Sequence, residues 1–481
     1  MGFIIKAALA ALLHASLTYA QAAATCANAL KPSYSAPVVG AGYTAQLIAT
    51  GLKKPRGILF DREGGLLVVQ QGTGIQRLTF TDSGGTCLAV KDSKTLVADS
   101  GLNHGIELSP DGRTLYASSA DKVYSWAYDA AGTGVSGRRT LVQNMSNSDH
   151  VSRTLLLSRR AEGVLLVSRG SSENMDMETR QVGSGRSQIR AFNVTDLPNG
   201  GRDAFDYGSG GTVLGWGLRN SVGVAEEPLT GGVFSVENSA DQIRRQGKDI
   251  HQDDPGEEMN FHGFLNGSLS SKEGNQGGNF GYPDCFALWG TDVPDKGDMV
   301  VGSQFALDPN DQLNDKTCAD KYVAPRLTFQ AHMAPLDIKF NSNGTEAYVA
   351  FHGSWNRNDP VGYKLSVVSF ANGQPVEPPT STTAAKDILS NADLSACPGK
   401  CFRPVGLAID DKGRIFMSSD STGEIYVLQK GDMTALGGGG SATSTPNVGP
   451  RSGRYRTAEG AWMAAGAAVL GLLGGMLMVA I

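Results

Sequence analysis

The sequence predicts an all-β fold, a six-bladed β-propeller with a long insertion after the fourth blade. Glycine is frequent, at 62 of 481 residues, and patterns of helical period are scarce between Tyr43 and Leu428. An apolar strand, a tight turn, a second strand, a polar gap and a third strand recur six times. The copies start about fifty to seventy residues apart, with one gap of about 115, which is the size of a propeller blade. A large β-sandwich is the alternative, but it seldom repeats one turn pattern.

The first copies define the repeat. Residues 56–61 turn at a Glu-Gly-Gly sequence into the strand 66–69, and Asp111-Gly112 leads into the strand 114–117. Asp-Gly and Lys-Gly dipeptides between apolar runs are hairpin signals. Further copies start near Arg153, Ser221, Leu336 and Val405. The long gap, residues 242–329, is predicted to be an insertion on one face and not a separate domain.

Both ends of the chain carry targeting signals. Residues 1–20 read as a signal peptide, with Lys6 before an apolar run, and the propeller is predicted to span 24–430. A flexible stalk (431–460) is predicted to contain the attachment region for a glycosylphosphatidylinositol (GPI) anchor. The apolar tail (461–481), which no charged residue follows, fits the removable anchor signal better than a true tail anchor, the alternative. We therefore expect an extracellular protein at the cell surface, bound to the membrane only through a lipid anchor.

The remaining composition agrees with an extracellular chain. Six cysteines, an even number, predict disulfides, and no Cys-x-x-Cys spacing favours zinc instead. The formal net charge of −5 gives no basic surface for nucleic acid. The expected disulfides are Cys397–Cys401, Cys285–Cys318 and Cys26–Cys87, and the expected glycosylation sites are Asn144, Asn193, Asn266 and Asn343.

Two motifs suggest a binding site. Gly217–Val224 contains the pair Arg219-Asn220, which offers a fixed cation and an amide to a planar, multiply charged ligand. Gly277–Pro283, about sixty residues later, is a glycine loop that lets the backbone approach closely where a side chain would not fit. If both line one cavity, the chain is a redox enzyme.

With these motifs the chain resembles the quinoprotein glucose/sorbosone dehydrogenase family, and most closely its fungal pyrroloquinoline-quinone (PQQ)-dependent pyranose dehydrogenases. The resemblance spans about Tyr43 to Leu428, and it implies PQQ and calcium at the central opening of one propeller face. Its most specific pieces are His150–Leu155, Gly217–Val224, Gly277–Pro283, Phe351–Arg357 and Arg403–Leu407.

The resemblance also implies which residues hold the cofactor. PQQ carries three carboxylates, and arginine pairs with carboxylates through two hydrogen bonds. Taken singly, each arginine also reads as a surface salt bridge, and Trp355 as ordinary blade packing. The predicted cofactor-binding residues are Arg56, Arg219, Arg357 and Arg403, each near a strand end in a different blade, with Asn220, His352 and Trp355.

His150 is the predicted general base, since it opens the third blade where the family places the histidine that deprotonates the sugar. His104, which opens the second blade, competes for this role. A near-neutral pKa suits proton abstraction at physiological pH. For calcium, which requires oxygen ligands, the predicted ligands are Ser239 and Asp241. Their acidic motif is interrupted relative to the bacterial enzymes, and Ser221-Val222 replaces the bacterial Pro-Gln.

The leading hypothesis is a dehydrogenase that oxidises a pyranose or aldose and reduces a quinone, a dye or a protein acceptor. No nicotinamide or flavin fingerprint, Gly-x-Ser-x-Gly elbow or His-Glu-x-x-His motif occurs in the sequence, nor is a haem domain evident. Two alternatives stay open: a calcium-dependent lactonase and a non-catalytic glycan-binding propeller, because propellers host many functions.

Overall fold

The computed structural model describes residues 26–27, 29–129, 131, 134–265 and 275–431. The chain divides into two compact units, Met1–Asp432 and Met433–Ile481, and the second lies outside the described residues. The predicted signal peptide, the stalk beyond residue 431, the apolar tail and the sequon at Asn266 also lie outside them. Within the described part of the chain, no helix has both the length and the apolar character to cross a membrane.

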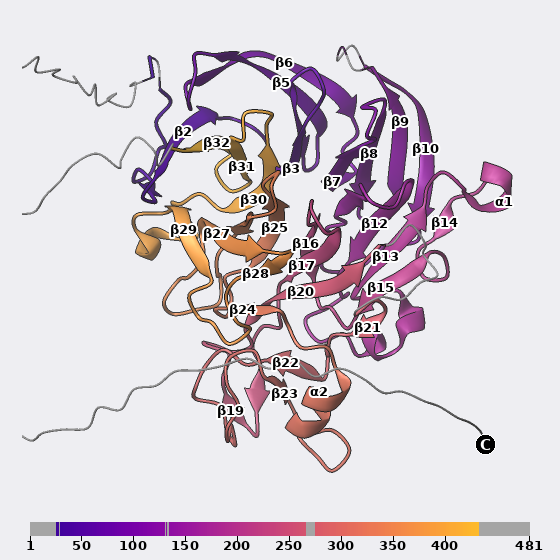
Figure 1. Cartoon of the computed structure of the whole chain (residues 1–481), viewed down its shortest axis with the longest axis vertical. Helices are drawn as coiled ribbons and strands as arrows, with labels where there is room; N and C mark the ends of the chain where they lie inside the picture. The colour runs from indigo at the N-terminus through magenta and orange to yellow at the C-terminus, as the bar shows by residue number, and fades with distance from the viewer. Residues whose placement is uncertain (1–25, 28, 130, 132–133, 266–274, 432–481) are drawn as a thin grey trace, which may run out of the picture. The chain divides into compact units, whose positions relative to one another are not determined.

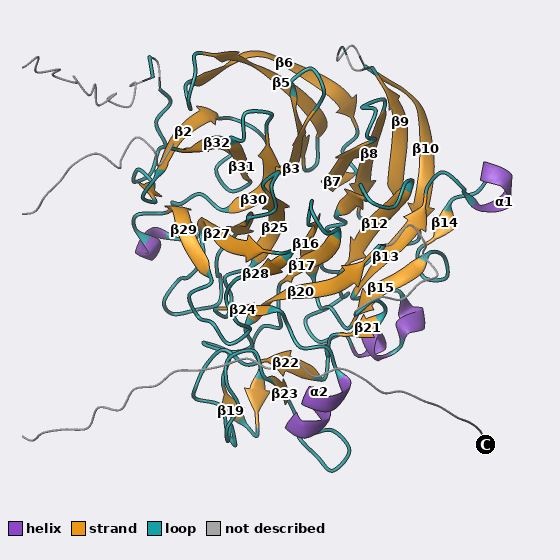
Figure 2. Ribbon diagram, in the orientation of Figure 1, coloured by secondary structure: helices purple, strands orange, loops and turns teal. Residues whose placement is uncertain are grey.

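Six sheets, each built on four antiparallel strands, surround a common axis in the unit Met1–Asp432, which confirms the six-bladed propeller (Figure 1). Figure 2 shows that strands dominate the described residues and that helices are short. The first three blades are β3 (Pro55–Phe60), β4 (Leu66–Gln70), β5 (Gly74–Asp82) and β6 (Leu88–Ala98); β7 (Leu102–Leu108), β8 (Thr114–Ser119), β9 (Val123–Tyr128) and β10 (Val135–Gln143); and β11 (Leu155–Leu157), β12 (Val164–Arg169), β13 (Gln188–Asn193) and β15 (Thr212–Trp216).

The last blade closes the ring with a strand from the start of the chain. In the sixth blade Tyr43 pairs with Lys430, so that β2 is its outermost strand. The other three blades are β16 (Ser221–Glu226), β17 (Gly232–Glu237), β20 (Glu257–Phe264) and β24 (Leu327–Phe329); β25 (Pro335–Phe340), β26 (Glu346–Phe351), β27 (Lys364–Ala371) and β29 (Ala385–Ser390); and β30 (Pro404–Ile409), β31 (Ile415–Ser419), β32 (Glu424–Lys430) and β2 (Tyr43–Ala49).

Short elements extend these sheets or connect them. The extra strands β1, β14, β21 and β28 pair with β29, β10, β15 and β27. The bounds of the remaining elements are β1 (Val38–Val39), β14 (Phe205–Asp206), β18 (Arg244–Arg245), β19 (Lys248–Asp249), β21 (Gly278–Asn279), β22 (Cys285–Ala287), β23 (Gln304–Ala306), β28 (Gln374–Pro375), α1 (Pro198–Gly201), α2 (Asp315–Lys321) and the 3₁₀ turns η1 (Met177–Arg180), η2 (Val182–Ser184) and η3 (Leu394–Ala396).

The first hairpin of the second blade follows the turn chemistry expected from the sequence. At the turn between β7 and β8, Gly112 has a φ of 69°, a conformation that L-residues rarely adopt. The carboxylate of Asp111 accepts a hydrogen bond from the backbone N–H of Arg113, 3.0 Å away. In the Asp-Gly dipeptide, the glycine therefore permits the turn and the aspartate stabilises it.

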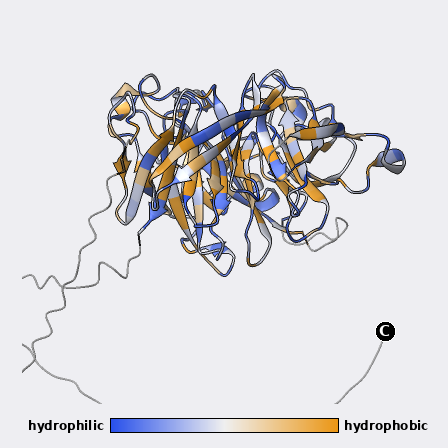
Figure 3. Ribbon diagram, turned by 90° about the horizontal axis from the view of Figure 1, so that it is seen from above, coloured by the Kyte–Doolittle hydropathy of each residue, from blue (hydrophilic) through white to orange (hydrophobic). Residues whose placement is uncertain are grey.

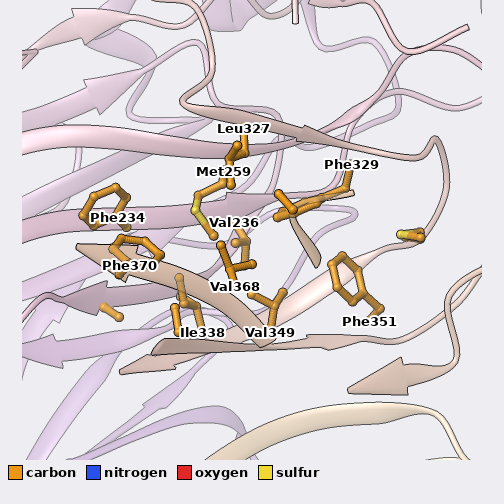
Figure 4. Packing of buried hydrophobic residues seen from close by; sticks show 14 residues of the cluster. Phe234, Val236, Met259, Leu327, Phe329, Ile338, Val349, Phe351, Val368 and Phe370 are labelled. Carbon is orange, nitrogen blue, oxygen red and sulfur yellow. The ribbon is translucent and has the colours of Figure 1, made fainter. Parts of the chain in front are cut away.

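The core consists of apolar layers between neighbouring blades. Six clusters of buried residues fill the six interfaces, including the one between the sixth and the first blade. Figure 4 shows the layer between the fourth and fifth blades, where Phe234 of β17 packs beside Phe370 of β27. In Figure 3 the apolar colour runs along the strands. Since every blade packs against two others, the blades hold the loops at one end of the axis in fixed positions.

The structure refines the bounds of the predicted insertion. Strands β20 and β24 of the fourth blade lie inside the range 242–329, so the added chain forms two segments, before β20 and between β20 and β24. In Figure 1 β19, β22, β23 and α2 lie together at the lower edge of the view. All three predicted disulfides are present: Cys26–Cys87, Cys285–Cys318 and Cys397–Cys401.

Candidate active site

One end of the propeller axis collects residues from distant parts of the sequence. Because antiparallel strands alternate in direction, the first strand of a blade begins at the same end where its second strand finishes. The residues at these two positions in different blades therefore meet around the axis. Those with functional side chains are Arg56, His104, His150, Arg219, Asn238, His352, Arg403 and Asp420.

The backbone at His150 has a rare conformation that other residues hold in place. Its φ is 40°, in the left-handed region that non-glycine residues seldom adopt. The fully buried Arg153 donates hydrogen bonds to the backbone oxygens of His150, Ser152 and Met145, at 2.7, 2.7 and 2.5 Å. The Asp149 carboxylate accepts from the His150 N–H at 2.8 Å. These bonds fix the direction in which the imidazole points.

The hydrogen bonds of the His150 ring define its tautomer. Nδ1 lies 2.9 Å from Ser171 Oγ and 3.2 Å from Ser171 O. The Ser171 hydroxyl donates to Glu173 O at 2.7 Å, so its oxygen acts as an acceptor toward His150. Nδ1 therefore carries the proton, and Nε2, which has no hydrogen-bond partner among the described residues, keeps its lone pair.

Burial and a nearby cation keep this ring neutral. Desolvation and the charge of Arg219 lower the pKa of His150 to about 4, and Asp149 opposes this shift only in part. At physiological pH the ring is therefore a neutral imidazole with one free lone pair. Gly170 allows the crowding, because a Cβ there would lie 2.6 Å from Asn220 Oδ1 and 2.7 Å from His150 Cβ.

Arg56, His352 and Arg403 form one connected group around Asp420. Arg56 Nη1 donates to one oxygen of Asp420 at 2.6 Å, and His352 Nε2 lies 2.9 Å from the other. Arg403 donates from Nε to His352 O at 3.1 Å and from Nη2 to Gly353 O at 2.7 Å. Burial would raise the pKa of Asp420, but the His352 hydrogen bond and the Arg56 charge hold it below its usual range. The Asp420 carboxylate of the sixth blade is thus an anion that contacts one residue of the first blade and one of the fifth.

Two guanidinium nitrogens of this group have no hydrogen-bond partner among the described residues. Within the described residues, neither Arg56 Nε nor Arg403 Nη1 donates a hydrogen bond, and neither is fully buried. Arg56 Nη2 reaches Ser152 Oγ, 3.3 Å away, which connects this group to the segment that carries His150. Two guanidinium groups with unused donors beside a neutral imidazole fit a ligand that carries several carboxylates, as PQQ does.

Arg219 lies on the other side of His150 and is fully engaged by the protein. Its guanidinium donates hydrogen bonds to five oxygens, of which three are backbone carbonyls, one is a side-chain amide and one is a carboxylate. These oxygens are Asn174 O at 3.1 Å, Asn238 O at 3.3 Å, Ser239 O at 2.5 Å, Asn174 Oδ1 at 2.8 Å and Asp241 Oδ2 at 3.0 Å. A guanidinium has five N–H groups, so in this conformation none remains for an external ligand.

The predicted calcium ligands belong to this same oxygen set. Ser239 O and the Asp241 carboxylate both accept hydrogen bonds from Arg219, and Asn356 Nδ2 donates to Asp241 Oδ1 at 2.7 Å. Three or more His, Cys, Asp or Glu side chains arranged to hold a metal do not occur in the described residues. Backbone and carboxylate oxygens suit calcium chemically. As arranged here, however, they surround a guanidinium, and a calcium ion does not fit beside it.

Two predicted cofactor residues lie outside this cluster. Arg357 donates from Nη1 to Asp253 at 3.0 Å and from Nε to Asp359 O at 3.1 Å. Trp355 is 66% exposed, so it is not blade packing. Both belong to the loop after β26, and neither is joined to Arg56, Arg403 or Arg219 by a hydrogen bond. Their cofactor roles stay predictions.

His104, the competing candidate for the base, is placed differently from His150. It is 4% exposed, and burial lowers its pKa well below the usual value, with the Arg56 charge acting in the same direction. Its Nδ1 is buried without a hydrogen-bond partner. Unlike His104, His150 has a ring oriented by hydrogen bonds and a partly exposed side chain, at 13% exposure.

The structure adds residues that sequence reasoning missed. Asp420, Ser171 and Asn174 each hold a predicted site residue, and all follow the second strand of a blade. That repeated position was the signal which could have revealed them. His332 was missed as well: its Nδ1 lies 3.4 Å from Asp241 Oδ1. Burial lowers the pKa of His332, but Asp241 and Glu257 outweigh this and raise it.

Fold and site together define a six-bladed propeller with a cationic, histidine-containing opening, and the comparisons with known proteins agree. A profile of the TrAA12-like family matches residues 37–431, and the chain belongs to this family. A Hypocrea jecorina protein named pyrroloquinoline quinone-dependent sugar dehydrogenase is 54% identical over 407 residues, which cover 84% of this chain and 91% of that protein.

Solved structures give the same assignment. The holo PQQ domain of a Coprinopsis cinerea pyranose dehydrogenase aligns at a TM-score of 0.77 and 38% identity, covering 84% of this chain and 99% of that domain. A calcium structure of a Trichoderma reesei protein of carbohydrate-active enzyme family AA12 aligns at 0.80 and 54%, covering 84% and 100%. This chain spans 56% of the length of a Coprinopsis cinerea PQQ-dependent pyranose dehydrogenase to which it is 39% identical.

Proposed function

We propose that this chain is a PQQ-dependent dehydrogenase that oxidises a pyranose or related aldose and passes the electrons to a quinone, a dye or a protein acceptor. The observation that carries the proposal is the neutral His150, whose Nε2 accepts no hydrogen bond from the described residues and whose segment is joined to Arg56 through Ser152. Family membership supports it, since the matched relatives carry PQQ-dependent dehydrogenase names.

Each group has a distinct role in this proposal. When bound, PQQ supplies the two-electron oxidant that accepts hydride from the sugar carbon. His150 Nε2 accepts the proton of the hydroxyl on that carbon, while Ser171 holds Nδ1 and so keeps the ring in place. Arg56 and Arg403 bind carboxylates with their unused N–H donors, and the negative charge of Asp420 offsets the repulsion between the two guanidinium groups.

Reconstitution tests this function directly. Purified protein is mixed with PQQ and calcium, and sugar-dependent reduction of a dye is followed with a broad panel of pyranoses and aldoses. We expect turnover that requires both PQQ and a sugar. No turnover with any sugar, together with no change in the PQQ absorbance spectrum on adding protein, would contradict the proposal. That result would favour the glycan-binding alternative, which the comparisons do not support.

The proposed location is outside the cell, at its surface. Three disulfides support it, because disulfides persist in oxidising compartments. The sequon residues Asn144 and Asn343 are exposed, while Asn193 is half-buried. Cell fractionation of the full-length chain with and without a phospholipase that cleaves GPI anchors would test both the location and the anchor.

A further inference from the structure

The guanidinium of Arg219 lies where a metal ion would be expected. We call the five oxygens around it, from Asn174, Asn238, Ser239 and Asp241, the oxygen cage. Three neutral backbone carbonyls, one amide oxygen and one carboxylate form the kind of ligand set that calcium takes in proteins. The shortest distance, 2.5 Å, joins Arg219 Nη1 to Ser239 O. The oxygen cage therefore has the chemistry of a cation site, and a side chain of this chain occupies it.

The charges around the oxygen cage are balanced with the arginine in place. Asp241 Oδ2 forms an ion pair with Arg219 Nη2 at 3.0 Å, and His332 Nδ1 lies 3.4 Å from Asp241 Oδ1. A divalent ion added beside Arg219 would meet a like charge and find each oxygen already bonded. The guanidinium and a divalent cation therefore exclude each other.

Only the side chain of Arg219 has to move for such an exchange. Its backbone N–H donates to Glu237 Oε1 at 2.7 Å, and its carbonyl accepts from Ser171 N at 2.9 Å. The oxygen cage is also fixed by its backbone, since Ser239 N donates to Glu257 Oε2 at 2.7 Å and Asn238 N to Asn220 O at 3.0 Å. The site would stay formed when the guanidinium leaves it.

We propose that Arg219 is a tethered internal cation: it fills the oxygen cage when no metal is bound, and it must leave before calcium binds there. A released guanidinium then has five free donors beside His150, at the same opening as Arg56 and Arg403. Calcium binding is thus coupled to the release of Arg219, which makes its guanidinium available to an anionic ligand. This inference concerns cation binding alone and does not depend on the dehydrogenase activity.

Cation affinity without PQQ is the decisive measurement. Calcium binding is titrated by calorimetry, and Tb³⁺ luminescence serves as a second readout. Because the wild-type protein must release Arg219 first, Arg219→Gln should bind calcium about tenfold or more tightly. Arg180→Gln, the matched control, removes an arginine that is exposed and paired with Asp284 outside the oxygen cage, and its affinity should equal the wild type. An unchanged or weaker affinity in Arg219→Gln overturns the proposal.

A second experiment uses the wild-type protein, so it does not depend on the folding of a variant. If release of Arg219 precedes binding, the observed rate constant of Tb³⁺ binding in stopped flow should level off as Tb³⁺ increases. A rate constant that rises linearly throughout contradicts the mechanism. Asp241→Asn identifies the signal, because removing the cage carboxylate should abolish the saturating phase. A phase that persists unchanged in Asp241→Asn would place the ion elsewhere and also overturn the proposal.

Discussion

The two halves of the opening both contain buried positive charge, but they differ in how many of its hydrogen-bond donors are paired with protein acceptors. In the first, the Asp420 half, Arg56 and His352 share one carboxylate, and donors of Arg56 and Arg403 remain unused. In the second, the Arg219 half, every donor of the guanidinium has a protein acceptor. The Asp420 half is therefore ready for an anionic ligand as it stands, whereas the Arg219 half must first rearrange.

His150 lies between these halves, and its replacement should have the largest effect. His150→Ala removes the Nε2 lone pair, so sugar-dependent turnover should fall by about 10²- to 10⁴-fold, the usual contribution of a general base. PQQ affinity should change little, because His150 carries no charge at neutral pH. Dye reduction and absorbance titration with PQQ measure the two effects separately. His104→Ala is the discriminating partner: if it abolishes turnover while His150→Ala does not, the base is His104.

The next largest effect concerns the Asp420 half. Arg403→Gln should weaken PQQ binding by about 10- to 100-fold, since a hydrogen bond to a charged group contributes about 1.5–3 kcal/mol. Arg414→Gln is the matched control: it removes a buried arginine from the same blade, at the opposite end of its second strand. Its affinity should stay at the wild-type value. Equal affinities in both variants would remove Arg403 from the cofactor site.

Three buried carboxyl groups, those of Glu237, Glu257 and Glu258, lie near the Arg219 half, and they should make the stability of the protein depend on pH. Glu258 is 4% exposed; burial raises its pKa to about 7, although Asn260 donates to it at 2.9 Å. A folded-state pKa above the unfolded value stabilises the protein at low pH, and this contribution is lost as pH rises toward about 7. Glu258→Gln should therefore flatten the fall in stability between about pH 5 and 7, by on the order of 1–3 kcal/mol.

Chemical denaturation at several pH values checks this prediction. Asp111→Asn provides the comparison, because this carboxylate lies in an exposed hairpin of the second blade and its pKa is lowered, not raised, by Ser109. It should leave the pH profile between 5 and 7 unchanged. A Glu258→Gln profile that still falls like the wild type would assign the pH dependence to other groups, such as Glu257.

The difference between local patterns and long-range contacts explains which features could be predicted from the sequence. Blade starts such as Arg56 and Val405 were recognisable, because apolar strands and Asp-Gly turns are local patterns. Arg219 was recognised as a site residue, but its partners were not, since Asn174 is 45 residues away along the chain. Strands β20 and β24 were hidden as well: β20 begins with Glu257 and Glu258, whose side chains are polar yet buried. Polar residues that tertiary contacts bury carry no local strand signal.

The loop that joins the two halves is the place where a substitution should have the smallest effect. Asn356 of this loop donates to Asp241 in the Arg219 half, and His352 contacts Asp420 in the other half. Trp355 lies between them in sequence and is 66% exposed, so Trp355→Ala should leave stability almost unchanged. If its indole stacks on the cofactor as the family resemblance implies, PQQ affinity should fall by about 2- to 13-fold, because aromatic stacking contributes about 0.5–1.5 kcal/mol. Trp355→Phe, which keeps an aromatic face, should recover most of that affinity. A loss as large as that of Arg403→Gln would instead mean that the loop closes over the ligand, and that the two halves act as one site.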